Sequence, residues 1–260
     1  MKDLQDALNL ACSASEEELN KFLYHSSIRV LQRILINPNL TEDHVLILSG
    51  RRNLPFEIIE SIYADNRWKD SYRIKLALCK NPKTPQRISL SLIKSLKILD
   101  LADLTRNKNI PINVRAKAEA HIIEKIISLP LGIKMTLARR ASNNVLLRLI
   151  EDGMKEVVDI CLESPYITEG DICKIISMKK ITSQVIRQIA NHPKWSVRYT
   201  VQLSLIMNNH TPLSRIVYFL SNIKTSDLRE LYNFPSLPIS TKPFVYRELS
   251  NREENKHELE

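Results

Sequence analysis

The chain matches itself when it is shifted by 127 residues. At this offset Trp68 meets Trp195 and Tyr72 meets Tyr199, and no gap is needed. A chain built from copies of one segment folds as a repeat array, in which each copy buries its apolar face against the next. The same offset also joins these identical pairs: Pro38 and Pro165, Thr41 and Thr168, Asn81 and Asn208, Thr84 and Thr211, Pro85 and Pro212, Asp100 and Asp227, Pro111 and Pro238.

Two copies of such a unit fill almost all of the 260 residues. We therefore expect a first helical-repeat unit at residues 1–127, a second at 128–254 and a charged tail at 255–260, forming one continuous array. This division leaves no length for a separate catalytic domain.

Local patterns predict that the chain is all-α. Apolar residues recur at spacings of three and four for about ten residues and then stop at Pro, Asn, Ser or Thr, which is typical of short helices. Only 4 glycines occur, too few for a fold with many tight turns. Helices are expected near residues 3–12, 16–24, 27–36, 42–49, 55–64, 69–79, 85–95, 99–105 and 111–127, and again 127 positions later.

The helix boundaries carry their own signals. Thr41 follows Asn37-Pro38 and is placed to cap a helix, and the similar run Asn81-Pro82-Lys83-Thr84-Pro85 comes 44 residues later. Asn81 and Asn208 are predicted to end helices in the left-handed conformation. Asp100 and Asp227 are predicted to be helix N-caps or first-turn acids. Helical pairs of about 40 residues match the period of HEAT and armadillo repeats.

Two short segments resemble known repeat families. Val114-Arg115-Ala116-Lys117-Ala118-Glu119 and Trp195-Ser196-Val197-Arg198-Tyr199 resemble the second helix of HEAT-like repeats. The Asn-Pro-x-x-Thr and Asn-Pro-x-Thr-Pro starts are similar to those of leucine-rich-repeat-variant arrays and of a group of bacterial HEAT-like proteins. The resemblance implies a right-handed α-α superhelix (a HEAT/armadillo-like solenoid) whose concave face grips a partner, and it implies no reaction. The family's arginine is replaced by Lys242 and by Ser71 at the shifted positions of Arg115 and Arg198.

The two tryptophans have two interpretations. Each stands four residues before a tyrosine, so the two rings could close the gap between neighbouring repeats. The alternative is a stacking role toward a ligand or a nucleic-acid base. We favour packing, because an inter-repeat wedge has to be kept in both copies and a specific pocket does not.

Signals for catalysis are missing from the sequence. The six histidines show no HxxxH or HExxH spacing, the glycines are solitary, and no GxSxG motif occurs. We therefore expect no catalytic residue, no metal and no cofactor, although a glycosidase-like pair of carboxylates is left open by sequence alone. The four cysteines form no CxxC pair and predict reduced, buried thiols.

Charge is the strongest indication of a partner. The formal net charge is +9, which favours acidic partners. The doublets Arg51-Arg52, Arg139-Arg140 and Lys179-Lys180 are the candidate partner-binding residues. The competing interpretation is that cations near helix ends only interact with the helix dipole. The start of the chain has no signal-peptide pattern and no apolar stretch approaches twenty residues, so we expect a cytoplasmic protein without membrane insertion.

These observations lead to a preferred function and two alternatives. We expect a non-enzymatic repeat scaffold that binds a protein with an acidic face on its concave surface. The first alternative is a sequence-independent nucleic-acid-binding HEAT-like protein that uses the basic residues. The second is a small-molecule or metal enzyme.

Overall fold

The computed structural model describes residues 2–257, and in this part of the chain every regular element is helical, as predicted. The chain divides into two compact units, residues 1–125 and 126–260, called unit 1 and unit 2 below. The predicted tail begins at residue 255, but α18 (Lys242–His257) runs through its first residues, and residues 258–260 lie outside the described part.

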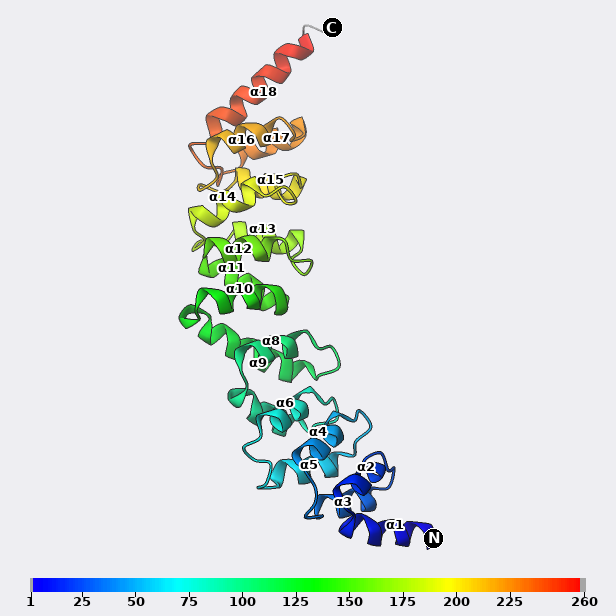
Figure 1. The fold of residues 1–260 in the computed structure, drawn as a ribbon. Helices are drawn as coiled ribbons and strands as arrows, with labels where there is room; N and C mark the ends of the chain where they lie inside the picture. The colour runs from blue at the N-terminus through cyan, green and yellow to red at the C-terminus, as the bar shows by residue number, and fades with distance from the viewer. Residues whose placement is uncertain (1, 258–260) are drawn as a thin grey trace. The chain divides into compact units, whose positions relative to one another are not determined.

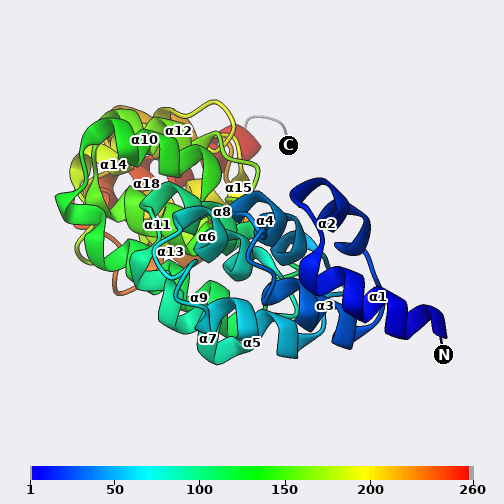
Figure 2. The same cartoon turned by 60° about the horizontal axis from the view of Figure 1, so that its bottom comes forward.

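Unit 1 consists of two rows of helices (Figures 1 and 2). In one row α1 packs on α3, α3 on α5, and α7 on α9, and in the other α4 packs on α6 and α6 on α8. The bounds are α1 (Lys2–Ser13), α2 (Glu16–Phe22), α3 (Ile28–Leu35), α4 (Glu42–Gly50), α5 (Phe56–Ala64), α6 (Tyr72–Lys80), α7 (Gln86–Leu92), the 3-10 turn η1 (Ile93–Ser95), α8 (Ile98–Arg106) and α9 (Ile112–Lys125).

Unit 2 repeats this arrangement. Helices α10, α12 and α14 pack in one row, α11, α13 and α15 in the other, and α18 packs on both α16 and α17. The bounds are the 3-10 turn η2 (Ile126–Ser128), α10 (Leu131–Arg140), α11 (Asn143–Asp152), α12 (Lys155–Leu162), α13 (Glu169–Ile176), α14 (Ser183–Asn191), α15 (Tyr199–Ile206), α16 (Leu213–Leu220) and α17 (Thr225–Asn233).

Helix bounds agree between the units at the 127-residue offset. Three pairs, α3 with α12, α5 with α14, and α8 with α17, correspond at both ends. Three predicted starts are wrong: residue 69 against Tyr72, residue 196 against Tyr199, and residue 238 against Lys242. In the first case Ser71 caps the helix by accepting a hydrogen bond from the Ile74 amide (3.2 Å), so the preceding residues belong to a turn.

Asparagine side chains join neighbouring helix pairs. The amide nitrogen of Asn81 donates to the carbonyls of Ser49 (2.7 Å) and Arg51 (2.9 Å), and Asn208 donates in the same way to Ile176 (2.7 Å). The prediction of a left-handed cap is wrong, because Asn81 is extended, with φ −80° and ψ 122°. Its amide bonds require the side chain to point back into the previous pair, and the extended backbone permits this.

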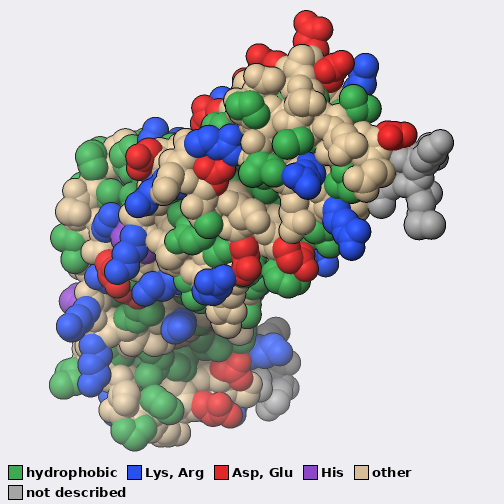
Figure 3. All heavy atoms as spheres, turned by 90° about the horizontal axis from the view of Figure 1, so that it is seen from below, with side chains coloured by type: hydrophobic (Ala, Val, Ile, Leu, Met, Phe, Trp, Pro, Cys, Tyr) green, Lys and Arg blue, Asp and Glu red, His purple; other side chains and the backbone are tan. Residues whose placement is uncertain are grey.

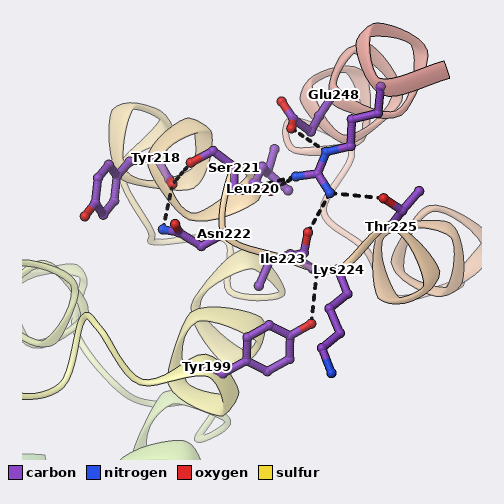
Figure 4. A network of polar contacts seen from close by, with 10 residues as sticks. Tyr199, Tyr218, Leu220, Ser221, Asn222, Ile223, Lys224, Thr225 and Glu248 are labelled. Atoms are coloured by element: carbon purple, nitrogen blue, oxygen red, sulfur yellow. Dashed lines mark hydrogen bonds and ion pairs between the residues drawn. The ribbon is translucent and has the colours of Figure 1, made fainter. Parts of the chain in front are cut away.

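Arginines in both units satisfy the carbonyl groups that end a helix. Arg252 of α18 donates to the carbonyl of Leu220, the last residue of α16 (2.9 Å), and to the carbonyl of Ile223 just beyond it (2.7 Å), while its Nε donates to Glu248 (2.8 Å; Figure 4). The last four carbonyls of a helix have no partner within the helix, so such contacts stabilise its end. Part of the positive charge of the chain therefore has a structural use.

Tyrosine and aspartate link successive helix pairs at the same place in both units. The Tyr72 hydroxyl donates to Asp100 and accepts from the Lys97 amide (3.1 Å). Tyr199 makes the same two bonds to Asp227 and to the Lys224 amide (3.1 Å), the second of which is visible in Figure 4. Asp100 and Asp227 thus lie in the first turn of their helices, as predicted.

Candidate partner-binding surfaces

The first predicted doublet divides between two roles. Arg51 follows α4, and its guanidinium donates to the carbonyls of Leu23 and His25 (3.4 Å) beyond α2. Arg52 is exposed. The helix-end interpretation thus describes Arg51, and Arg52 is the member of this doublet that faces solvent.

The second and third doublets lie on opposite edges of unit 2. Arg139 and Arg140 end α10, next to the edge where α11 and α13 begin, since Asn143 donates to Asp171 across that edge (2.8 Å). Lys179 and Lys180 follow the end of α13 and are exposed. The structure therefore does not bring these two doublets together.

Lys179 and Lys180 border a hollow of about 420 Å³ at the ends of α11 and α13. Its lining includes Arg148 and Glu151, which pair at 2.7 Å. Of the basic residues that line this hollow, Arg148 is paired with Glu151, and Lys179 and Lys180 are the other two. An acidic group bound here would meet both of them.

A larger groove of about 860 Å³ crosses the row of α13, α15 and α17 in unit 2. Its apolar lining comes from Met178, Leu203, Met207, Leu231 and the exposed Phe234. The polar lining consists of Ser177, Lys179, Ser204, Asn208, Asn209, His210, Asp227 and Glu230. An exposed aromatic ring beside a groove with mixed polar groups is typical of a surface that accepts an apolar side chain of another molecule.

Sequence analysis missed a basic edge in unit 1. Lys80 and Lys83 follow α6, Lys108 follows α8, and Arg52 follows α4, and all four are exposed. The Asn81 bonds hold the ends of α4 and α6 together, and the Tyr72–Asp100 bond aligns the starts of α6 and α8. In the sequence these residues are single cations after successive helix ends, and only Arg52 belongs to a doublet.

The basic side chains do not collect in one patch of the face drawn in Figure 3. Lys and Arg side chains are spread there among acidic and apolar ones. Spread charge of this kind is the ordinary surface of a soluble helix, so net charge alone selects no site.

The two tryptophans differ in their surroundings. Trp195 is buried, and its indole donates to the Leu162 carbonyl (2.9 Å). Trp68 is half-buried, and the equivalent carbonyl, Leu35, accepts from the guanidinium of Arg67 instead. The sequence predicts that each ring pairs with the tyrosine four residues on, but in the structure each ring lies beside a cation: Arg67 is 5.1 Å from the Trp68 centroid and Lys194 is 4.3 Å from that of Trp195.

The groups associated with metal or thiol chemistry are dispersed. Within residues 2–257 no cluster of three His, Cys, Asp or Glu side chains is arranged to hold a metal ion. All four cysteines are free, and burial raises the pKa of the Cys79 and Cys161 thiols to about 12. Cys12 and Cys173 are only half-buried, so the prediction of burial is wrong for these two.

None of the helices in the described part of the chain combines the length and the apolar character that crossing a membrane requires. Comparison with family models, with curated proteins and with solved structures finds no match to this chain.

Proposed function

We propose that the chain is a non-enzymatic helical-repeat scaffold, a HEAT-like solenoid built from two copies of one 127-residue unit, which binds a protein partner on its concave face. The corresponding helix bounds of the two units and the paired Tyr72–Asp100 and Tyr199–Asp227 links support the duplication. Stacked helical pairs present long rows of side chains, and in such arrays recognition is a property of this surface.

The observation that carries the binding role is the groove along α13, α15 and α17. Met207 and Phe234 supply apolar contact area, and flexible methionines adapt to different bound side chains. Lys179 lies on the same groove. The partner segment that fits this lining carries an apolar anchor residue and, near it, an acidic residue for Lys179 and Lys180.

A peptide selection tests this proposal. Random peptides displayed on phage are selected on the full chain, and the affinity of the best binders is measured for Phe234→Ala. The residue 127 positions earlier is Asn107, so Asn107→Ala is the matched control in unit 1. We expect the unit 2 variant to weaken binding by about tenfold or more, as for the loss of an aromatic anchor, and the control to leave it unchanged.

The selected sequences provide a second measurement. Enrichment of acidic residues beside an apolar one, together with weaker binding by Lys179→Glu combined with Lys180→Glu, supports the proposed partner. Binders that tolerate every groove variant would overturn it.

The basic edge of unit 1 supports a second candidate, sequence-independent binding of nucleic acid. Arg52, Lys80, Lys83 and Lys108 stand at the ends of helices in one row, and neighbouring packed helices lie about 8–10 Å apart. Such a row of cations fits the phosphates of one nucleic-acid strand.

A salt titration separates the two candidates. Binding to random duplex DNA through phosphates falls with salt, with a slope of about 0.9 per phosphate contacted in a double-logarithmic plot. Lys80→Glu with Lys83→Glu should reduce the magnitude of this slope by the amount expected for the loss of about two phosphate contacts. Arg139→Glu with Arg140→Glu is the control on the other unit. No DNA binding at low salt removes this candidate.

A further inference from the structure

A pocket of about 430 Å³ lies in unit 1 among α5, α6, α7 and the loop that carries Trp68. Its lining includes the buried apolar side chains of Ile62, Ile74, Leu78 and Leu92, together with the Trp68 ring. A concave site that combines apolar side chains with polar groups able to orient a ligand is typical of small-molecule sites.

Hydroxyl groups form part of the rim. Ser91 donates to the Ile88 carbonyl (2.8 Å) and lies 3.1 Å from the Tyr63 hydroxyl, and Ser95 donates to the Leu92 carbonyl (2.7 Å). The serine protons are therefore engaged within the protein, while the serine oxygens still have capacity to accept.

The charged part of the rim is cationic. Lys69, Asp70 and the half-buried Lys75 line the pocket, which gives two positive charges against one negative. Arg67 adds a further cation 5.1 Å from the Trp68 centroid, although it also pairs with Asp65 at 2.7 Å. A bound anion would be favoured over a cation by this arrangement.

The residues at the equivalent positions of unit 2 are more deeply buried. Leu92 corresponds to Phe219, a larger side chain with 0% exposure. Lys75 corresponds to Gln202, which is buried and donates to the Ser196 carbonyl (2.8 Å). Trp195, at the position of Trp68, is buried as well.

The difference between the two units favours a ligand site over a purely structural role for the residues around Trp68. If the tryptophan loop served packing alone, the larger and more buried residues of unit 2 would suit both units. An unfilled apolar volume loses van der Waals contacts and is therefore unfavourable. Unit 1 instead has a smaller side chain at position 92 and a lysine at position 75.

We propose that the unit 1 pocket binds a small planar aromatic anion, with its ring against Trp68 and its acidic group toward Lys75. An aromatic ligand can make offset or edge contacts with the indole, which lines the pocket together with Ser91 and Leu92 of α7. The acidic group would lie at the rim, where solvent and lysine both stabilise it.

Naphthoate is a suitable probe, with naphthalenemethanol as its neutral analogue. The chain has two tryptophans and therefore two indole N–H signals in a nitrogen-15 correlation spectrum, which Trp68→Phe assigns. Adding naphthoate to the full chain should shift the Trp68 signal and leave the Trp195 signal in place. No shift of Trp68 up to millimolar naphthoate would overturn the proposal.

Residues borrowed from unit 2 give the sharpest variants. Leu92→Phe should abolish the shift without lowering the melting temperature, and Ser91→Tyr, which introduces the residue of position 218, is a second filling variant if the first does not fold. Phe219→Leu is the matched control in unit 2 and should leave the naphthoate-induced shift of the Trp68 signal unchanged. Unaltered binding by both filling variants would contradict the pocket as the site.

Lys75→Gln tests the charge. We expect it to weaken naphthoate binding about fivefold, as for the loss of one partly exposed ion pair, while naphthalenemethanol binds as before. Equal effects on the acid and the alcohol would overturn the role of Lys75.

Discussion

Units 1 and 2 use the same helices but treat their tryptophans differently. In unit 2 the indole of Trp195 ends a neighbouring helix by donating to Leu162, whereas in unit 1 Arg67 does so at Leu35 and leaves Trp68 beside a pocket. Bonds to helix-end carbonyls are thus kept, but the side chain that supplies them changes. What the two units share is that these helix-end carbonyls accept a hydrogen bond, whereas the loop residues that donate it differ.

The largest expected difference between the units is the cost of losing each tryptophan. Trp195→Ala should lower the free energy of unfolding by about 3–5 kcal/mol, because it empties a buried site and removes a hydrogen bond. Trp68→Ala should cost less, about 1–2 kcal/mol, because the ring is half-buried. Urea unfolding of both variants measures this, and equal costs would break the comparison.

A buried ion pair gives the next largest effect, and it has no equivalent in unit 1. Lys134 and Asp152 pair at 2.7 Å with side-chain exposures of 4% and 13%, whereas the positions 127 residues earlier hold Ala7 and His25. Lys134→Ala should cost about 3 kcal/mol, because it leaves a buried carboxylate without its partner. Lys134→Met with Asp152→Leu should recover most of this loss. If the double variant is as unstable as the single one, the pair is not the cause.

The costs of losing Asn81 and of losing Asn208 should differ by a smaller amount of unfolding free energy. Asn81→Ala removes two donated bonds, to Ser49 and Arg51, whereas Asn208→Ala removes the one to Ile176. We expect costs of about 2–3 and about 1–2 kcal/mol respectively, since a carbonyl that loses its buried partner adds a desolvation penalty. Thermal unfolding of the two variants ranks them, and the reverse order would contradict the bond count.

The smallest effect concerns acid. The Arg67 guanidinium beside Asp65 lowers the pKa of that carboxyl below its ordinary value of 3.8, while position 192 in unit 2 is a histidine. The unfolded chain binds this proton first as pH falls, so the stabilisation is present above about pH 4 and is lost through the folded pKa. Asp65→Asn should therefore cost about 1 kcal/mol at pH 7 and less at pH 3. Unfolding curves at both pH values test this, and a constant difference would refute it.

Sequence patterns were sufficient for the helices and insufficient for the surfaces. Helix positions follow from apolar spacing and from caps such as Ser71, which are local properties, so both units gave the same answer. The direction of the Asn81 side chain depends on a carbonyl about 30 residues away, which no local signal contains.

The candidate sites were harder still, because they depend on which edge a helix end occupies. Arg139-Arg140 and Lys179-Lys180 are similar as sequence and lie on opposite edges of unit 2. The pocket beside Trp68 is lined by Leu92, where unit 2 holds the larger and fully buried Phe219, and an apolar pattern treats these two residues alike.

The hydrogen bonds of Asn81 affect the order in which the helices can separate. The side chain of Asn81, which directly follows α6, donates to two carbonyls at the end of α4. Helix α6 therefore cannot separate from α4 without exposing those two carbonyls. Amide hydrogen exchange should accordingly be fastest at α1 and α18, the terminal helices of the chain, and slow down in steps at each asparagine. Opening would then proceed inward from these two helices, one helical hairpin at a time.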